Sequence, residues 1–256
     1  MNLKIGVFVI SVNNDHYLDS KPDYETQSTE KLIERWKLEK KNWEYISEKT
    51  NRYFSIHLLE CNKKCYDAKN FDCKCINCTE SYAPGIFQKT YYSFKHYDDY
   101  DFYVRTNLST FFIFEKLLEF LQKLPLHIPV YTGTDWSNPH YEELFKIKNF
   151  KYAQGTCIIM NNKARNIFID KGLKHINCNG ADDALISYIF YKNDIMFKKY
   201  NLAQMYFFNY NVKLDKNIEY INNKNVSYIR MKTDDIENYK KAIDQLIAVY
   251  YDKVSI

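Results

Sequence analysis

The sequence of 256 residues contains few of the residues that interrupt regular structure, with only 6 glycines and 5 prolines. Hydrophobic residues make up 46% of the chain and charged residues 27%. These fractions give poor support to a disordered, collagen-like or fibrous protein. The length fits one domain or at most two small ones, and the apolar content is enough for a sizeable core.

Long hydrophobic runs are also missing. The longest run near the N-terminus, Ile5–Ile10, has six residues before Ser11, whereas a membrane-spanning helix needs about 20. A signal peptide needs a longer apolar stretch and a small-residue cleavage site. We therefore predict no membrane span and a cytoplasmic location, either in a microbe or, for a viral protein, in the host cell.

Charge of one sign does not accumulate anywhere in the chain. Lys and Arg number 36 and Asp and Glu 32, which gives a formal net charge of +4. Since the basic residues form no polybasic arm, we expect no nucleic-acid partner. Aromatic residues are abundant, with 24 Tyr and 17 Phe. We interpret them first as the residue usage of an AT-rich genome and only second as platforms for stacking sugars.

The first 60 residues predict a strand, a helix and a second strand. Residues 4–12 are rich in β-branched side chains and predict a buried strand, and residues 28–49 carry apolar side chains at helical spacing. Residues 53–59 form the next strand. Two strands joined by a helix at this spacing are typical of a βαβ unit, so we expect a parallel sheet here.

The rest of the chain continues to alternate between helices and strands. We predict a helix over 111–124, a strand over 150–160 that is interrupted at Gly155, and a helix that is ended by Gly172. There is no internal repeat and no linker, so residues 1–256 are expected to form a single domain. The other predicted elements are helix 87–97, strand 100–105, strand 129–133, helix 163–171, helix 182–191, strand 226–232 and the C-terminal helix 234–251.

An irregular insert over residues 61–79 holds five of the seven cysteines. Four thiolates from one short loop would suit a structural zinc ion, but the spacing is irregular and one cysteine is left over. Structural zinc, disulfides and free thiols therefore all stay open. The five residues are Cys61, Cys65, Cys73, Cys75 and Cys78.

Polar residues follow the predicted strands at three places: residues 11–13, residues 105–110 and residues 177–183. Ligands of open α/β sheets bind beyond the carboxyl ends of the strands. In the third place Asp182 and Asp183 open a helix, so one of them is either an N-cap or a catalytic base. Gly180, just before them, would let a ligand approach the backbone closely.

Several stretches, taken in order, resemble nucleotide-sugar glycosyltransferases of the GT-A type, nearest the fringe and β-1,3-galactosyltransferase-like group. RTNLST followed by an aromatic run is similar to a divergent viral or microbial branch. The resemblance covers roughly the whole chain and implies an α/β protein made of a single GT-A (Rossmann-like) domain with a mixed, mostly parallel central sheet flanked by helices. The stretches are YDFYVRT (100–106), FKYAQGTCIIM (150–160) with NKAR (162–165), DDALISYI (182–189), VSYIRMK (226–232) and residues 82–89 with Thr90.

The resemblance implies an inverting transfer of a sugar from a nucleoside-diphosphate donor, UDP by expectation, to a hydroxyl of a glycan or small acceptor. It implies that the acid-acid helix start holds the catalytic base, for which we favour Asp183 over Asp182. The donor would be bound by Ser11, Val12, Lys89, Arg105, Thr106, Asn107, Ser109, Arg230 and Lys232.

The sequence departs from the family where its members hold a metal ion. The family's Asp-x-Asp positions are here Asn107, Leu108 and Ser109, which bring no charge to a divalent cation. The late-strand histidine is missing too. We therefore expect a metal-independent variant, while Mn²⁺ or Mg²⁺ stays an alternative. Arg230 and Lys232, at i and i+2 of a strand, would neutralise the diphosphate instead, or else face solvent.

Other polar residues allow two interpretations each. Arg105 needs a buried partner, either a carboxylate such as Asp182 or the donor phosphates. Asn107 and Ser109 would bind donor hydroxyls or merely cap a helix that starts at Thr110.

For the acceptor, Trp136 and Asp135 resemble a sugar-stacking ring beside a carboxylate, or else Trp136 is packed into the core. Gly155 and Gly180 complete the expected acceptor site. The rival function is a catalytically inactive glycan- or nucleotide-binding module, and a nucleotide-sugar hydrolase is a third.

Overall fold

A computed structural model describes most of the chain. The described residues are 3–11, 29–50, 52–61, 74–76, 83–178, 180–198, 200, 205–224, 226–233 and 235–252. They group into two compact units, each built from three separate stretches of sequence: residues 1–22, 53–107 and 124–202 in unit 1, and residues 23–52, 108–123 and 203–256 in unit 2. The expectation of a single domain stays a prediction.

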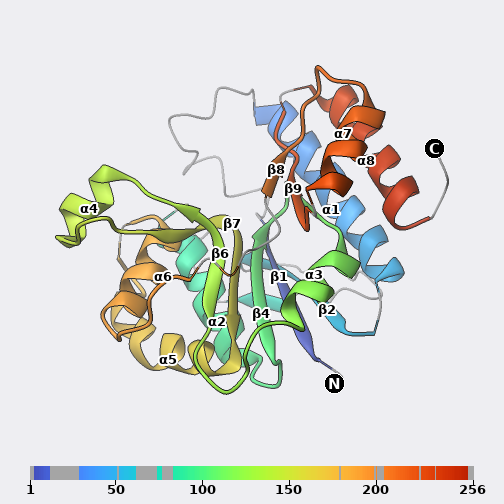
Figure 1. Cartoon of the computed structure of the whole chain (residues 1–256). Coiled ribbons are helices and arrows are strands. Elements are labelled where there is room, and N and C mark those ends of the chain that lie inside the picture. Colours follow the sequence, from blue (N-terminus) through green and yellow to red (C-terminus); the bar gives the residue numbers. More distant parts are fainter. Residues whose placement is uncertain are drawn as a thin grey trace. The chain divides into compact units, whose positions relative to one another are not determined.

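Unit 1 is built on a six-stranded sheet with the order β3-β2-β1-β4-β7-β6 (Figure 1). Neighbours from β3 to β4 are parallel, and β7 is antiparallel to both β4 and β6. The α/β class with a mixed, mostly parallel sheet is therefore confirmed. The strands are β1 (Ile5–Ile10), β2 (Phe54–Cys61), β3 (Lys74–Ile76), β4 (Phe102–Asn107), β6 (Tyr131–Trp136) and β7 (Tyr152–Asn161).

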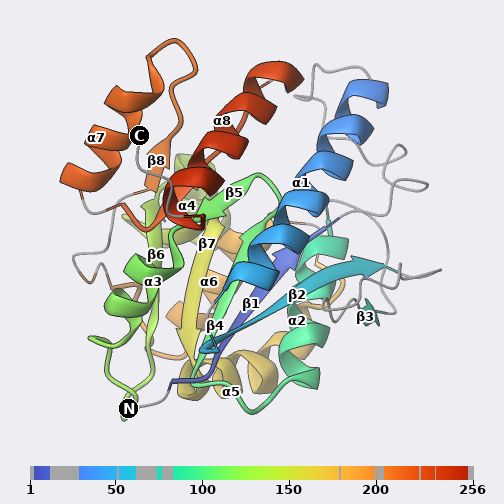
Figure 2. The same ribbon diagram turned by 90° about the vertical axis from the view of Figure 1, so that its right-hand side faces the viewer.

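Three helices of unit 1 pack on the sheet through one aromatic core. They are α2 (Gly85–His96), α5 (Asn162–Gly172) and α6 (Asp182–Tyr191), and they gather near the sheet in both ribbon views (Figures 1 and 2). All six residues of β1 are buried, as expected for a strand in the middle of a parallel sheet. The shared core joins Phe8, Tyr103, Tyr131 and Met160 of the sheet to Phe87, Phe94, Phe168 and Phe190 of the helices.

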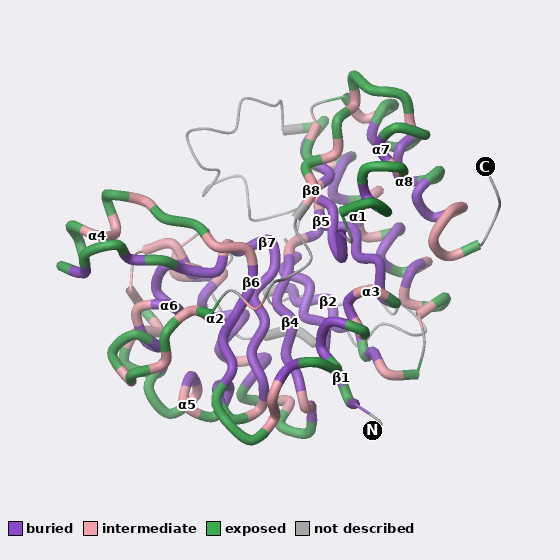
Figure 3. Tube along the Cα trace, in the orientation of Figure 1, coloured by how far each residue is buried: buried purple, intermediate pink, exposed green. Residues whose placement is uncertain are grey.

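Strands β6 and β7 form a long hairpin that carries α4 (Pro139–Phe145) at its end (Figure 3). Helix α4 was not predicted, although Asn138 caps it through its side chain and Pro139 stands in its first turn, which is a recognisable start signal. None of the seven residues of α4 is buried. The hairpin is therefore an arm that exposes side chains at the end of β6.

Unit 2 has a smaller sheet in the order β5-β9-β8, with β5 antiparallel and β8 parallel to β9. Trp43 of α1 donates its indole N–H to the Leu108 carbonyl at 2.9 Å. Glu39, which interrupts the apolar stripe of α1, is buried and lies 3.7 Å from Arg35. The elements are α1 (Thr29–Lys49), β5 (Thr110–Phe112), α3 (Phe114–Leu121), β8 (Met205–Phe207), α7 (Leu214–Asn223), β9 (Tyr228–Arg230) and α8 (Ile236–Tyr250).

Two details of the predicted elements are wrong, the start of a helix near residue 110 and the interruption of a strand at Gly155. Residues 110–112 are strand β5 instead of the start of a helix, because they pair with β9. Strand β7 continues through Gly155, where the pairing with β6 shifts register. The helix predicted to end at Gly172 does end there, as α5, and Gly172 has a φ of −74° before a 3₁₀ turn, Leu173–His175. A methyl group at Gly172 would come within 3.0 Å of Tyr91, so its role is close helix packing.

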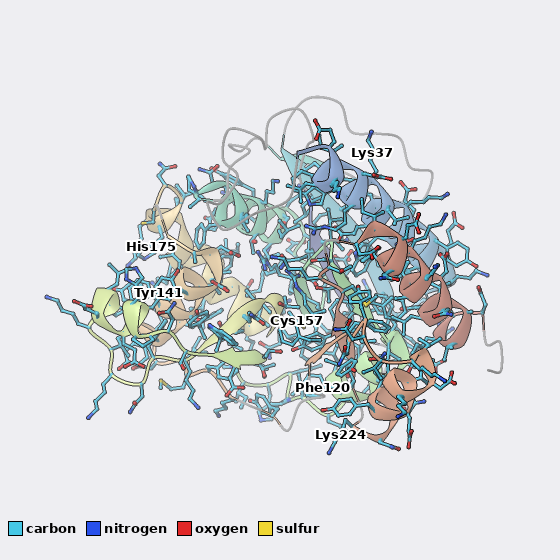
Figure 4. The ribbon with its side chains drawn as sticks, turned by 90° about the horizontal axis from the view of Figure 1, so that it is seen from above. Lys37, Phe120, Tyr141, Cys157, His175 and Lys224 are labelled. Atoms are coloured by element: carbon cyan, nitrogen blue, oxygen red, sulfur yellow. The ribbon has the colours of Figure 1, made fainter. Side chains whose placement is uncertain are left out.

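Most of the cysteine insert, including Cys65, Cys73 and Cys78, lies outside the described residues, so structural zinc and disulfides stay predictions. Two cysteines elsewhere, Cys157 and Cys178, are free thiols. Cys157 is buried in unit 1 (Figure 4), and burial raises the pKa of its thiol, which keeps it protonated and unreactive. Within the described chain, no helix is both long and apolar enough to cross a bilayer.

Candidate functional site

The candidate site forms around Arg105, the fourth residue of β4. Its side chain is 1% exposed, because β4 lies between β1 and β7. A buried guanidinium is stable only when charge and hydrogen bonds compensate it. Arg105 Nη2 lies 2.7 Å from Asp182 Oδ2, and Nη1 donates to the Gly155 carbonyl. Of the two partners predicted for Arg105, the structure gives it the carboxylate.

Gly155 of β7 connects Arg105 to the second carboxylate. Its carbonyl accepts from Arg105, and its N–H donates to Asp183 Oδ2 at 3.0 Å. A methyl group on Gly155 would lie 2.5 Å from Arg105 Nη1 and 3.5 Å from Asp183 Oδ2. Only glycine therefore allows this approach without displacing a side chain. The predicted acceptor residue is in the first place a structural junction between the two charged groups.

Asp182 and Asp183 are the first two residues of α6. The N-cap position is Ala181, and no side chain caps it, so the interpretation of either acid as a simple N-cap is wrong. Asp183 Oδ1 accepts the Ala184 N–H at 2.8 Å, so this carboxylate also satisfies one free amide of the first turn. Asp182 points instead at Arg105, and the two neighbouring acids have different surroundings.

The electrostatics of the pair favour a base that works near neutral pH. Burial and the adjacent Asp182 charge raise the pKa of Asp183 to about 6, while the Gly155 N–H and Arg105 oppose that rise. Burial raises the pKa of Asp182 too, against the Arg105 guanidinium. A carboxyl with a pKa near 6 is ionised at pH 7 and still basic enough to take a proton.

Ser187 and Tyr131, which were not predicted as site residues, form hydrogen bonds that fix the start of α6. Ser187 donates to the Asp183 carbonyl at 2.9 Å and contacts the Tyr131 hydroxyl. That hydroxyl accepts the Ala153 N–H at 3.0 Å. Residues from β6, β7 and α6 meet there, and no short motif in the sequence indicates the contact.

Two predicted donor residues, Ser11 and Lys89, meet at the end of β1. Lys89 is 1% exposed and donates to the Ser11 carbonyl at 2.6 Å, and the Ser11 hydroxyl donates to Glu60 at 2.8 Å. These side chains therefore order the chain where β1 ends. Val12 lies outside the described residues.

The end of β4 offers neutral groups only. Thr106 is buried and donates to the Thr156 carbonyl at 2.7 Å, while Asn107 is partly exposed. The described residues contain no group of three His, Cys, Asp or Glu side chains arranged to hold a metal ion. The residues present at 107–109 do not fit a hard divalent cation, which prefers carboxylates.

The remaining predicted donor residues, Ser109, Arg230 and Lys232, belong to unit 2. Ser109 does not cap a helix at Thr110, since strand β5 begins there, and its carbonyl accepts the Met231 N–H at 2.9 Å. Strand β9 ends at Arg230, so the two-residue periodicity of a strand does not extend to Lys232. Arg230 is partly buried, whereas Lys232 is exposed.

A pocket of about 300 Å³ lies where β6 ends and β7 begins. It is lined by Asp135, Trp136, Ser137 and Lys151, and Asp135 lies 3.8 Å from Lys151. Trp136 is 47% exposed, so the alternative of a core-packed Trp136 is wrong. Lys151 was missed because the antiparallel pairing of Trp136 with Tyr152 brings it here. Gly180, by contrast, has open space around it.

Neither a protein-family model nor a curated protein sequence matches the chain. Solved structures do resemble it. The galactosyltransferase LgtC, in complex with donor and acceptor sugar analogues, has a TM-score of 0.52 at 11% identity, over 94% of this chain and 95% of its own. The bifunctional glycosyltransferase WbbM has a TM-score of 0.53 at 12% identity, over 95% of this chain and 50% of its own. At these identities the likeness shows the GT-A-type fold alone.

Proposed function

We propose that this protein is a glycosyltransferase that moves a sugar from a nucleoside-diphosphate donor, UDP being the expected nucleotide, to a hydroxyl of a glycan or small acceptor with inversion. One observation supports this most. Asp183 is held by two backbone N–H groups beside the buried Arg105–Asp182 pair, with a pKa of about 6. The GT-A-type fold of the chain supports the substrate class by analogy.

In the proposed reaction Asp183 is the general base. Its carboxylate accepts the proton of the acceptor hydroxyl while that oxygen forms a bond to C1 of the donor sugar. The bond from C1 to the diphosphate oxygen breaks on the opposite face, and the nucleoside diphosphate leaves with the electron pair. Asp182 and Arg105 take no part in bond making, because they neutralise each other at 2.7 Å. Their role is to fix the position and basicity of Asp183.

The departing diphosphate needs positive charge, and we assign that role to Arg230 and Lys232. Both are basic residues, and Lys232 is exposed. Asn107 and Ser109 are proposed to hydrogen-bond donor hydroxyls. We assign Ser11 and Lys89 to shaping the donor site, since the Ser11 carbonyl holds the buried ammonium of Lys89.

The pocket at Trp136 is proposed to bind the acceptor. An exposed indole ring stacks on the apolar face of a sugar, and the Asp135 carboxylate beside it accepts hydrogen bonds from hydroxyls. The pocket of about 300 Å³ is at the small end of ligand sites, which range over about 300–1,000 Å³. This size suits one or two sugar rings of an acceptor.

The first test replaces the base. We expect Asp183→Asn to lower the transfer rate about 10²- to 10⁴-fold, the usual contribution of a general base, in an assay of nucleoside-diphosphate release from a panel of UDP-sugars and acceptors. Asp99→Asn is the matched control, because Asp99 is a surface acid of the same unit with 62% side-chain exposure. Full activity in Asp183→Asn would refute the assignment.

The same panel of donors and acceptors distinguishes a glycosyltransferase from a catalytically inactive binding module. The neutral residues at 107–109 are the observation that favours the module. A thermal shift with nucleoside diphosphates and no turnover with any acceptor would favour it. Donor consumption without an acceptor would instead indicate a hydrolase.

A second test concerns the metal. We propose that transfer needs no divalent cation, because Asn107, Leu108 and Ser109 supply no carboxylate. The expected result is an unchanged rate after dialysis against EDTA. Loss of activity with EDTA and recovery with Mn²⁺ would show that a metal is required.

A further inference from the structure

A second cavity in unit 1 is lined mainly by basic side chains. It has a volume of about 290 Å³ and lies where α5, the following 3₁₀ turn and the end of α6 meet. Figure 4 labels His175 in this region. The lining residues, taken from the described part of the chain, include no carboxylate. They are Lys171, Lys174, His175, Tyr188, Ile189, Lys192 and Asn193.

Three lysines give this small cavity a formal charge of +3, which is close to the net charge of the whole chain. Lysines near helix ends also interact favourably with the terminal carbonyls, and that effect explains each position singly. It does not require three of them to surround one hollow. The partners they have are weak: Lys171 pairs with the exposed Asp170 at 2.6 Å, and exposed pairs contribute about 0–1 kcal/mol.

Contacts among the lining side chains involve the ring of Tyr188 and the imidazole of His175. Tyr188 stacks on Phe145 with ring centroids 4.4 Å apart, and His175 meets its edge at 6.0 Å. Lys192 Nζ lies 5.6 Å from the centre of the Tyr188 ring. His175 Nδ1 lies 3.8 Å from the Cys178 sulfur. The cavity therefore combines an aromatic wall with three ammonium groups, which suits a ligand with a ring and an anionic group.

We propose that this cavity is a binding site for a small phosphorylated ligand of about the size of a sugar phosphate, separate from the site at Asp183. Lys174 and Lys192 bind the phosphate oxygens as point charges. Tyr188 supports the apolar face of the ligand. Its volume of about 290 Å³ is close to the lower limit of ligand sites, about 300 Å³, which suits a single ring with its phosphate. The site goes beyond the proposed sugar transfer and does not depend on it.

His175 provides a reporter inside the cavity. Burial, and then the neighbouring charge of Lys174, lower the pKa of its imidazole. Lys171 and Lys192 add positive charge around it, and Tyr188 and Cys178 are the other titratable side chains beside it. A bound phosphate would reverse this field and raise the pKa of His175. The imidazole signals in an NMR titration therefore report the site without any assay of activity.

The experiment titrates the full-length protein with glucose 1-phosphate, pyrophosphate and glucose while recording the His175 ring signals over pH. We expect saturable binding of glucose 1-phosphate with a rise in the pKa of His175, and weaker binding of glucose. In the double variant Lys174→Gln/Lys192→Gln we expect the dissociation constant to increase at least about tenfold, because two charge-assisted contacts are lost. Lys148→Gln, an exposed lysine of the same unit outside the cavity, should bind like the wild type.

The three ligands show which chemical groups the cavity recognises. Tighter binding of pyrophosphate than of glucose 1-phosphate would overturn the ring-plus-phosphate assignment. Equal binding of glucose and glucose 1-phosphate, or unchanged affinity in the double variant, would overturn the site. A failure of these titrations leaves the transferase proposal intact, because the Asp183 variants are assayed separately.

Discussion

At the scale of residues, one arginine and two aspartates with different surroundings define the candidate site. Arg105 neutralises Asp182 at 2.7 Å, so Asp183 is the acid whose charge is poorly compensated. The two N–H groups on Asp183 stabilise its ionised form, yet burial and Asp182 outweigh them. Paired acids whose surroundings separate their roles are a usual arrangement in catalytic sites.

This imbalance predicts a pH-dependent cost in stability. The pKa of Asp183 rises from 3.8 to about 6 on folding, so the folded state holds its proton more tightly than the unfolded state. The protonated Asp183 carboxyl therefore stabilises the folded state. This contribution is complete below pH 3.8 and is lost as the pH rises through 6. Relative to Asp183→Asn, the wild type should lose about 2 kcal/mol of unfolding free energy between pH 4 and pH 7. Urea unfolding at several pH values measures this, and parallel curves for the two proteins would contradict it.

At the scale of elements, the site depends on the part of β7 around Gly155, just beyond its antiparallel pairing with β4. The register shift of β7 against β6 lies around Gly155, and the Gly155 peptide uses both its N–H and its carbonyl on the charged pair. In a strand that continued in regular pairing, this N–H and this carbonyl would form hydrogen bonds with the neighbouring strand. The irregularity therefore frees one peptide to align the start of α6 with β4.

Gly155→Ala tests that dependence. The added methyl group would lie 2.5 Å from Arg105 Nη1, so we expect a loss of about 1–3 kcal/mol of stability from overpacking together with a lower transfer rate. Gly180→Ala is the control, because nothing lies within 4 Å of its added carbon and its stability should change by less than about 0.5 kcal/mol. Chemical denaturation and the transfer assay measure both variants. Equal behaviour of the two variants would contradict the junction role of Gly155.

At the scale of the whole molecule, the two units are interleaved in the sequence. Unit 1 takes residues 1–22 as well as two later segments, and its β1 pairs with both β2 and β4. Removing β1 would expose two strand edges in the middle of the sheet. Neither unit is therefore a continuous piece of chain that carries all its own strands.

A fragment of residues 53–202 should therefore fail to fold. It lacks β1, whose six residues are all buried between β2 and β4. We expect the fragment to show no cooperative thermal transition by far-UV circular dichroism and poor amide dispersion by NMR. The full chain should show a cooperative transition and well-dispersed amide signals. A cooperative transition in the fragment would show that β1 is dispensable.

Much of the architecture follows from local patterns, and the misses have physical causes. The buried first strand, the long helix with Trp36 and Trp43 on its inner face, and the acid-acid start of α6 are all visible in the sequence and confirmed. The prediction that a helix starts near residues 110–112 was wrong because three aromatic and β-branched residues fit either a helix or a short strand. Only the pairing with β9 decides between the two. Ser187 and Tyr131 were missed because their contact joins residues 56 positions apart.

The sequence by itself determined the α/β class, the order of most elements and the candidate residues Arg105, Asp182 and Asp183, because periodicity and strand ends are local properties of the chain. The tertiary structure alone decided which acid pairs with Arg105, that Gly155 joins them and that Lys151 lies beside Trp136. Those facts depend on strand register and helix placement, which arise from packing between distant segments and leave no mark on any short stretch of sequence.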